Sequence, residues 1–222
     1  MTKKQRALEI INRLKTEYPD AACTLDYDHA WQLLVSVRLA AQCTDARVNI
    51  VVQDLFAKYP SVAALAEAEP EDIEAIVKPC GLGRSKARDI SACMRMLRDK
   101  YDCKVPTTFE ELLALPGVGR KTANVLGAVL WQKEVMPVDT HVFRVSERIG
   151  LTTGSKTPLQ TELTLEKHIP GHLLPVAHHW LILHGRYVCT ARAPKCGECG
   201  ISAWCRKYAA DRRAKRPERD GE

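Results

Sequence analysis

The sequence predicts an all-α protein. Apolar side chains recur three and four positions apart in several segments of the 222-residue chain, which is the period of helices with one buried face. No segment shows the apolar and polar alternation of a half-buried strand. Prolines near the predicted helix ends favour many short helices joined by tight turns over a long bundle. These prolines are Pro60, Pro70, Pro106, Pro116, Pro137, Pro158 and Pro175.

Periodicity places the first helices. The helix over residues 3–17 has Leu8, Ile11 and Leu14 on its apolar face, so we expect those side chains to be buried. Residues 30–42 are apolar nearly all round, which indicates a central helix. Two further helices are predicted over residues 46–58 and 84–101.

Turn signals place the later helices. A capping box, formed either by Thr107 with Glu110 or by Thr108 with Glu111, precedes an apolar run. Two helices, over residues 108–114 and 120–131, are then joined by a glycine-containing hairpin. Asp139 stands where an N-cap is expected for a helix over residues 140–148.

A short pattern occurs twice. Gly81-Leu82-Gly83 and Gly117-Val118-Gly119, thirty-six residues apart, each precede a basic, alanine-containing helix start. Such glycines leave the first N–H groups of the helix accessible, and those groups can bind a phosphate. The alternative is that the glycines only let two helices cross closely.

Four cysteines lie within 17 residues with the spacing C-x6-C-x2-C-x5-C: Cys189, Cys196, Cys199 and Cys205. A structural zinc site usually takes two short cysteine pairs from separate knuckles, whereas four sulfurs from one continuous loop suit a 4Fe-4S cluster. The spacing therefore favours iron and sulphur over zinc. The other five cysteines, which we expect to be buried thiols, are Cys23, Cys43, Cys80, Cys93 and Cys103.

The charge is unevenly distributed. The chain carries a formal net charge of +6, yet residues 184–219 alone hold ten Lys and Arg against three Asp and Glu, a local +7. A basic region around a metal loop suggests a polyanionic partner; the alternative for its last residues is a solvated tail. No apolar run is long enough to cross a membrane and no signal-peptide pattern is found, so we expect a soluble cytoplasmic protein, associated with the nucleoid.

These motifs together resemble the endonuclease III family of helix-hairpin-helix DNA glycosylases. Leu115–Ala123 (LPGVGRKTA) resembles the family hairpin, Val138–Arg144 (VDTHVFR) its VDTH segment, and the cysteine spacing its iron-sulphur loop; His179–Arg186 (HWLILHGR) is also similar. The resemblance runs from about residue 33 to residue 205. It implies a six-helix domain at residues 22–133, a cluster domain of residues 1–21 and 134–206 holding a 4Fe-4S cluster, and DNA bound across both. Residues 207–222 lie beyond the resemblance, and we expect them to be disordered.

The resemblance also implies the chemistry. Lys121 matches the family's catalytic lysine, whose amine forms a Schiff base with deoxyribose and allows strand cleavage by β-elimination. Partial burial and the positive helix end would both favour its neutral form. Asp139 matches the catalytic aspartate, which stabilises positive charge or relays a proton. Lys86 also follows a Gly-x-Gly turn, but its register is one residue later, so a helix turns it away by roughly 100°.

Further residues are expected to contact DNA. Gln42 matches the family glutamine that fills the space left by an everted nucleotide, and Leu82 matches an apolar wedge; their alternatives are a helix-end amide and a buried loop leucine. The hairpin contacts are Gly117, Val118, Gly119 and Arg120. Arg192 and Lys195, in the cysteine loop, are expected to face the phosphate backbone.

The function implied is base excision repair of double-stranded DNA by a bifunctional glycosylase and AP lyase acting on oxidised pyrimidines, as a monomer. One alternative is the adenine-specific branch of the superfamily. That branch uses a glutamate in the helix before Gln42, but residues 33–39 (LLVSVRL) contain no carboxylate. The other alternative is a non-catalytic DNA-binding module, in which Lys121 and Asp139 could be replaced without loss.

Overall fold

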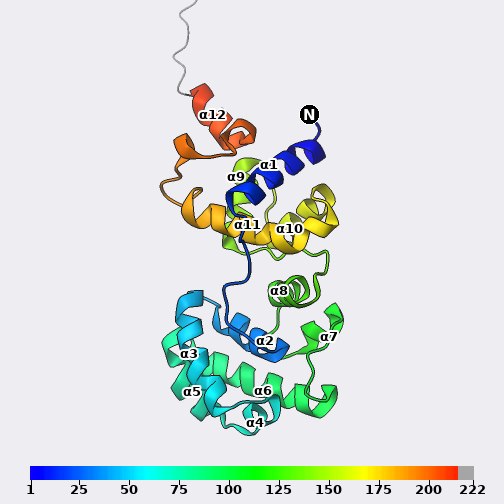
Figure 1. Cartoon of the computed structure of the whole chain (residues 1–222), viewed down its shortest axis with the longest axis vertical. Coiled ribbons are helices and arrows are strands. Elements are labelled where there is room, and N and C mark those ends of the chain that lie inside the picture. Colours follow the sequence, from blue (N-terminus) through cyan, green and yellow to red (C-terminus); the bar gives the residue numbers. More distant parts are fainter. Residues whose placement is uncertain (215–222) are drawn as a thin grey trace, which may run out of the picture. The chain divides into compact units, whose positions relative to one another are not determined.

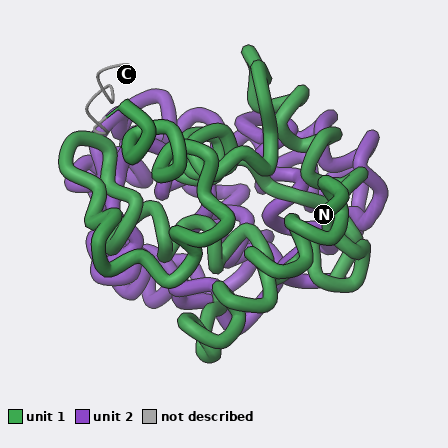
Figure 2. The backbone as a smooth tube through the Cα atoms, turned by 90° about the horizontal axis from the view of Figure 1, so that it is seen from above, with its two compact units in different colours: residues 1–22, 132–222 green, residues 23–131 purple. Residues whose placement is uncertain are grey.

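The computed structural model of the protein describes residues 1–214. Within those residues the regular structure is helical throughout, which confirms the all-α fold class. The chain forms two compact units (Figure 2): unit 1 combines residues 1–22 with the segment that starts at Gln132, and unit 2 is Cys23–Trp131. Each unit has its own apolar core.

Unit 2 surrounds the central helix that the sequence predicts (Figure 1). Helix α2 buries eight of its ten residues and packs against α3, α6 and α8. Pro70 starts a new helix, α5, directly after the short α4. The helices of unit 2 are α2 (Ala30–Leu39), α3 (Asp45–Lys58), α4 (Val62–Glu67), α5 (Pro70–Val77), α6 (Gly83–Tyr101), α7 (Phe109–Ala114) and α8 (Arg120–Trp131), with the 3-10 turn η1 (Lys78–Cys80).

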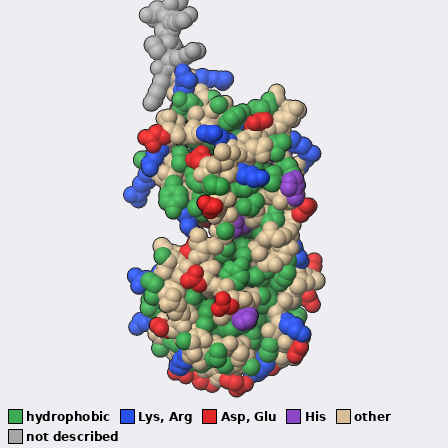
Figure 3. Space-filling model, viewed as in Figure 1, with side chains coloured by type: hydrophobic (Ala, Val, Ile, Leu, Met, Phe, Trp, Pro, Cys, Tyr) green, Lys and Arg blue, Asp and Glu red, His purple; other side chains and the backbone are tan. Residues whose placement is uncertain are grey.

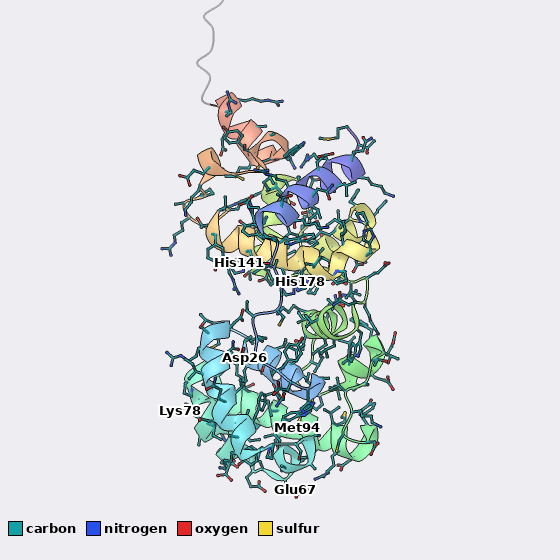
Figure 4. The ribbon with its side chains drawn as sticks, viewed as in Figure 1. Asp26, Glu67, Lys78, Met94, His141 and His178 are labelled. Carbon is teal, nitrogen blue, oxygen red and sulfur yellow. The ribbon has the colours of Figure 1, made fainter. Side chains whose placement is uncertain are left out.

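Helix α6 shows why periodicity located these elements well. Its apolar side chains, among them Met94 (Figure 4), form one stripe that joins the core of unit 2. The helix ends at Asp102, whose φ of 50° is left-handed, and Cys103 follows with φ 58°. This turn leaves Cys103 exposed, so the expectation that it is a buried thiol is wrong. Cys80 and Cys93 are buried as expected, whereas Cys23 and Cys43 are half-buried.

Unit 1 brings the N-terminal helix onto the last third of the chain. Helix α1 packs against α10 and α11, and the Trp180 indole donates a hydrogen bond to the Tyr18 carbonyl at 3.1 Å. The buried positions of α1 include Ile11 and Leu14 but not Leu8, which is 37% exposed; Ile10 is buried instead because the stripe is one position off the predicted face. The helices are α1 (Lys3–Glu17), α9 (Thr140–Ile149), α10 (Pro158–His168), α11 (Leu174–Tyr187) and α12 (Arg206–Ala214), with the 3-10 turns η2 (Gly171–Leu173), η3 (Cys196–Glu198) and η4 (Ser202–Trp204).

Helices α9 and α11 cross closely at Gly185. A Cβ on that residue would lie 3.0 Å from Val145 and 3.1 Å from the His141 Cβ. Only glycine therefore permits this approach without displacing a neighbour. The crossing fixes the start of α9, and with it the VDTH segment, against α11.

The disorder expected for residues 207–222 is wrong for the described part of that segment. Residues up to Ala214 belong to α12. The helix is rich in Ala, Arg and Lys, all good helix formers, and Lys207 pairs with Asp211 at 2.7 Å, four residues apart. Residues 215–222 lie outside the described residues.

No helix within residues 1–214 is both long enough and apolar enough to cross a lipid bilayer.

Candidate active site and iron-sulphur loop

The glycine hairpin is built onto the body of unit 2. Thr108 caps α7 by accepting a hydrogen bond from the Glu111 N–H at 3.3 Å. The Thr108 hydroxyl also donates to the Glu111 carboxylate at 2.6 Å. Of the two predicted pairs, the second therefore forms the cap, with a bond between the two side chains in place of the bond to the N-cap N–H that defines a capping box. Val118 is buried at 9% exposure, and the chain between Leu115 and Arg120 turns tightly with Val118 N–H donating to the Leu115 carbonyl at 3.1 Å.

The two hairpin glycines are required for different reasons. Gly117 has φ +75°, and a Cβ there would lie 2.8 Å from the Asp89 Cβ and 3.1 Å from the Arg38 Nε. Arg38 Nε and one terminal nitrogen of Arg38 both donate to Asp89 Oδ2, at 2.8 and 2.6 Å, and this ion pair supports the hairpin. A Cβ on Gly119, by contrast, would meet nothing within 4 Å. Packing therefore explains Gly117 but leaves Gly119 unexplained.

Two basic side chains follow the hairpin. Arg120 and Lys121 begin α8 and are both exposed. The Arg120 guanidinium lies 5.0 Å from the centre of the Phe109 ring, a cation–π arrangement that holds it beside the hairpin.

Lys121 lies near the segment that enters unit 2. Burial raises the pKa of the half-buried Cys23 thiol, while the positive charge of Lys121 lowers it and the negative charge of Asp45 raises it. The starts of α8 and α3 thus converge on Cys23. The partial burial expected for Lys121 is not found, because its side chain is exposed within the described protein; the helix start remains the source of positive potential there.

Lys86, the other lysine that follows a Gly-x-Gly turn, is buried and hydrogen-bonded within the protein. Its side chain is fully buried at 0% exposure, and its amine donates to the carbonyls of Leu39 at 2.8 Å and Cys80 at 2.9 Å. Burial lowers its pKa, and the Cys80 and Cys43 thiols act in the opposite direction. A nucleophile must reach its substrate, so this geometry excludes the buried Lys86 from that role.

Gln42 and Leu82 share an uncommon backbone conformation. Their φ angles are 57° and 53°, in the left-handed region that residues with a Cβ rarely occupy. Both side chains are exposed, and Leu82 is 54% exposed. The exposure of Leu82 contradicts the alternative of a buried leucine, whereas the position of Gln42 just after α2 remains compatible with a helix-end amide. Sequence inspection gave no signal of this strain.

The part of unit 2 around α4 and α5 is acidic. Figure 3 shows Asp and Glu side chains gathered at the end that carries α4, and the exposed residues there include Glu67, Glu69, Glu71 and Asp72. Such a surface repels phosphate. The hairpin and the left-handed turns are therefore the better anion-facing parts of this unit.

Asp139 is the N-cap of α9, as predicted. One carboxylate oxygen accepts from the Val142 N–H at 2.7 Å and the other lies 3.0 Å from His141 Nδ1. Figure 4 shows His141 at the start of α9. The Asp139 side chain remains 24% exposed. The two contacts fix its orientation, and the sequence assigned no role to His141.

The four clustered cysteines surround one cavity. Cys189, Cys196, Cys199 and Cys205 line one pocket in unit 1 together with His184 and Arg148. Among residues 1–214, no group of three or more His, Cys, Asp or Glu side chains is placed to hold a metal ion. The four cysteines nevertheless share one pocket, and four thiolates are a ligand set of a 4Fe-4S cluster.

The electrostatics of these thiols fits the same cofactor. Burial, the largest cause, raises the pKa of Cys199 to about 11, and the charges of Cys205, Glu17 and Cys189 act in the same direction. Burial also raises the pKa of Cys205. Thiolates here are costly without a positive centre, which the irons of a cluster supply.

Two arginines of α9 hold the cysteine loop in place. Arg148 donates to the carbonyls of Thr190 at 2.6 Å and Ala191 at 2.7 Å, and Arg144, one turn earlier, donates to those of Gly185 and Cys189 at 2.9 and 3.3 Å. The sequence gave only a weak signal for them, two arginines four positions apart. Arg192 and Lys195, further along the loop, are exposed.

Family models match both units. Residues 35–171 match the HhH-GPD superfamily base excision DNA repair protein. Residues 189–205, which begin and end with two of the clustered cysteines, match the iron-sulfur binding domain of endonuclease III. The protein accordingly carries a 4Fe-4S cluster as cofactor.

Relatives of known name resemble nearly the whole chain. Endonuclease III of Synechocystis sp. is 46% identical over 205 residues, covering 92% of this chain and 93% of that protein. Endonuclease III of Escherichia coli strain K12 is 40% identical over 202 residues, covering 91% of this chain and 95% of that protein. A solved structure described as a trapped covalent intermediate of endonuclease III with DNA matches with a TM-score of 0.90 and 40% identity over 96% of this chain and 100% of that chain.

The paired motifs, the two-unit helical architecture and these likenesses lead to one assignment: the chain belongs to the endonuclease III family of base excision DNA repair enzymes, the iron-sulphur DNA glycosylases with AP lyase activity.

Proposed function

We propose that this protein removes oxidised and ring-saturated pyrimidines from double-stranded DNA through a Schiff base on Lys121, and then cleaves the strand by β-elimination. The observation that carries the assignment is the contrast between two lysines that follow Gly-x-Gly turns. Lys121 is exposed at the start of α8, whereas Lys86 is buried with its amine bonded to two carbonyls.

Gly119 supports DNA contact at the hairpin. Among the described residues, no heavy atom beyond its chain neighbours lies within 4 Å of where its Cβ would be, so a close-approaching ligand is a physical reason for glycine there. The first turn of α8, with Arg120 beside it, presents N–H groups and positive charge. A phosphate of the DNA backbone fits that chemistry, and the exposed Arg192 and Lys195 of the cysteine loop add to the basic surface.

The reaction begins with the everted nucleotide. The neutral Lys121 amine attacks C1′, the glycosidic bond breaks, and the base leaves with its electron pair and takes up a proton. The sugar ring opens to an iminium ion on the Lys121 nitrogen. Loss of a C2′ proton then expels the 3′ phosphate, and water releases the lysine.

Asp139 is proposed to assist the same reaction. Its carboxylate, oriented by Val142 and His141, stabilises positive charge on the sugar or accepts a proton. Gln42 and Leu82 are proposed to enter the base stack where the nucleotide leaves. Cys189, Cys196, Cys199 and Cys205 are the proposed ligands of the 4Fe-4S cluster, which supplies a fixed anchor for the loop between them. We also propose that the protein acts as a monomer, associated with the nucleoid.

Borohydride trapping on an abasic duplex tests the nucleophile. Wild-type protein and Lys100→Ala, which alters an exposed lysine of α6, should each give a covalent protein–DNA band. Lys121→Ala should give none, because no iminium forms for borohydride to reduce. A band of wild-type intensity with Lys121→Ala would rule this lysine out.

Lesion preference needs a separate assay. Duplexes that carry thymine glycol or 8-oxoguanine are incubated with the protein, and the released bases are quantified. Faster release of thymine glycol is expected. Release of only the purine lesion would contradict the proposed substrate class.

A further inference from the structure

Lys86 connects the two turns that hold Gln42 and Leu82. Its amine donates to the carbonyl of Leu39, the last residue of α2, at 2.8 Å, and to that of Cys80, the last residue of η1, at 2.9 Å. Gln42 follows Leu39 by three residues, and Leu82 follows Cys80 by two. One buried side chain therefore bonds the backbone just before each turn.

Both turns are strained. Gln42 and Leu82 have φ angles of 57° and 53° although neither is glycine. Such conformations persist only where the surroundings determine them. Local hydrogen bonds help to hold each conformation; for example, the Cys43 N–H donates to the Ala40 carbonyl at 3.1 Å. Such a bond stabilises only the turn that contains it. The Lys86 amine bonds to both.

The Lys86 amine is buried and has no access to solvent. Lys86 is 0% exposed, and the thiols of Cys43 and Cys80, one beside each turn, are its electrostatic neighbours. A buried amine without acceptors would be costly, and here two carbonyls satisfy it. The two turns cannot separate without leaving that amine unbonded.

We propose that Lys86 is a positioning residue that holds the Gln42 and Leu82 turns at a fixed separation, so that both side chains enter the DNA stack as one preformed unit. The inference rests on the proposed insertion of Gln42 and Leu82. Two side chains held in place before binding lose less conformational freedom on insertion than two independent turns. Lys86 would thus favour eversion without touching the sugar.

The test compares strand cleavage at an abasic site in duplex DNA with cleavage at the same site in a single strand, using cluster-loaded protein. A single strand has no opposite strand and no helical stack to fill, so insertion matters little there. Lys86→Met keeps an unbranched side chain, one atom shorter than lysine, and removes its donors. We expect the duplex rate to fall about tenfold and the single-strand rate by less than about twofold.

Two variants serve as controls. Met94→Ala removes a buried side chain from the same helix, so it should lower the melting temperature and leave the duplex-to-single-strand ratio unchanged. Lys86→Gln retains N–H donors on a shorter side chain and should give an intermediate ratio. If Lys86→Met does not fold, Lys86→Gln provides the reading. A folded Lys86 variant with the wild-type ratio overturns the inference.

A double variant distinguishes the positioning role of Lys86 from the proposed insertion of Gln42 and Leu82, on which it rests. Gln42→Ala with Leu82→Ala should itself lower the ratio, and adding Lys86→Met to it should lower the ratio no further. If the double variant keeps the wild-type ratio, the proposed insertion of Gln42 and Leu82 fails. If the double variant lowers the ratio and Lys86→Met alone does not, only the positioning role fails.

Discussion

The two glycines of the hairpin, Gly117 and Gly119, differ in what requires them: one is needed for stability and the other, in our proposal, for DNA contact. Gly117 is fixed by its left-handed backbone and by Arg38 and Asp89 beneath it, whereas Gly119 has open space where a Cβ would lie. Glycine is thus required at position 117 by packing within the protein and, in our proposal, at position 119 by the close approach of DNA.

Alanine substitutions should reveal this difference. Gly117→Ala should destabilise the protein by about 1–3 kcal/mol, because it combines a positive φ with a 2.8 Å contact to Asp89. Gly119→Ala should change the free energy of unfolding by less than about 1 kcal/mol and weaken binding to an abasic duplex. Urea unfolding and a binding titration measure the two effects. An equal loss of stability in both variants would contradict the distinction.

Asp139 is the N-cap of α9 and, in our proposal, also a catalytic carboxylate, and the two roles can be tested apart. Asparagine is as good an N-cap as aspartate, while alanine is a poor one. Asp139→Asn should therefore keep the stability of α9 within about 0.5 kcal/mol, and Asp139→Ala should cost about 1 kcal/mol. Both should slow base release, since both remove the negative charge. Urea unfolding and single-turnover excision provide the measurements. Wild-type excision by Asp139→Asn would show that the residue is only a cap.

Helix α9 also supports the cysteine loop from its other end. Arg148→Met removes the hydrogen bonds to the Thr190 and Ala191 carbonyls, and we expect faster loss of the cluster's visible absorbance in the presence of a chelator. The loop carbonyls lose their partners and the loop becomes more mobile. Arg95→Met, which removes a single bond to the Ala66 carbonyl in unit 2, is the matched control. Equal absorbance decay in the two variants would show that Arg148 does not hold the loop.

Over the whole molecule, acidic and basic side chains are unevenly distributed, and this distribution bears on DNA binding. The net charge is +6, and Lys and Arg outnumber Asp and Glu in the C-terminal third of the sequence. Acidic side chains collect around α4 and α5. Each phosphate contact releases counterions, so salt weakens binding in proportion to the number of contacts.

The salt dependence of DNA binding should therefore identify the contacting cations. Arg192→Ala combined with Lys195→Ala should make the negative slope of log K against log salt less steep by about 2, if each residue contacts one phosphate. Lys3→Ala combined with Lys4→Ala removes the same charge from exposed positions of α1 and should change the slope little. Identical slopes for the two double variants would remove the cysteine loop from the DNA interface.

Local patterns in the sequence were sufficient for much of this structure. Helix α2 was predicted because its residues are apolar all round, and the α7 cap, the hairpin and the Asp139 cap were predicted because their signals lie within a few consecutive residues. Periodicity failed by one position in α1, where Leu8 is exposed, because two neighbouring apolar stripes both fit the helical period. It also could not show that Cys103 is turned outward by a left-handed C-cap.

By itself, the sequence determined the all-α class, the family resemblance and the cysteine spacing that suits a 4Fe-4S cluster. Each of these depends only on residues that are close together in the sequence. Only the tertiary structure decided that Lys86 is buried between two strained turns, that Arg148 holds the cysteine loop and that Lys121 is exposed. Lys86 and its acceptor at Leu39 are 47 residues apart. Backbone carbonyls are present at every residue, so no residue type marks which one a distant amine will meet until the chain has folded.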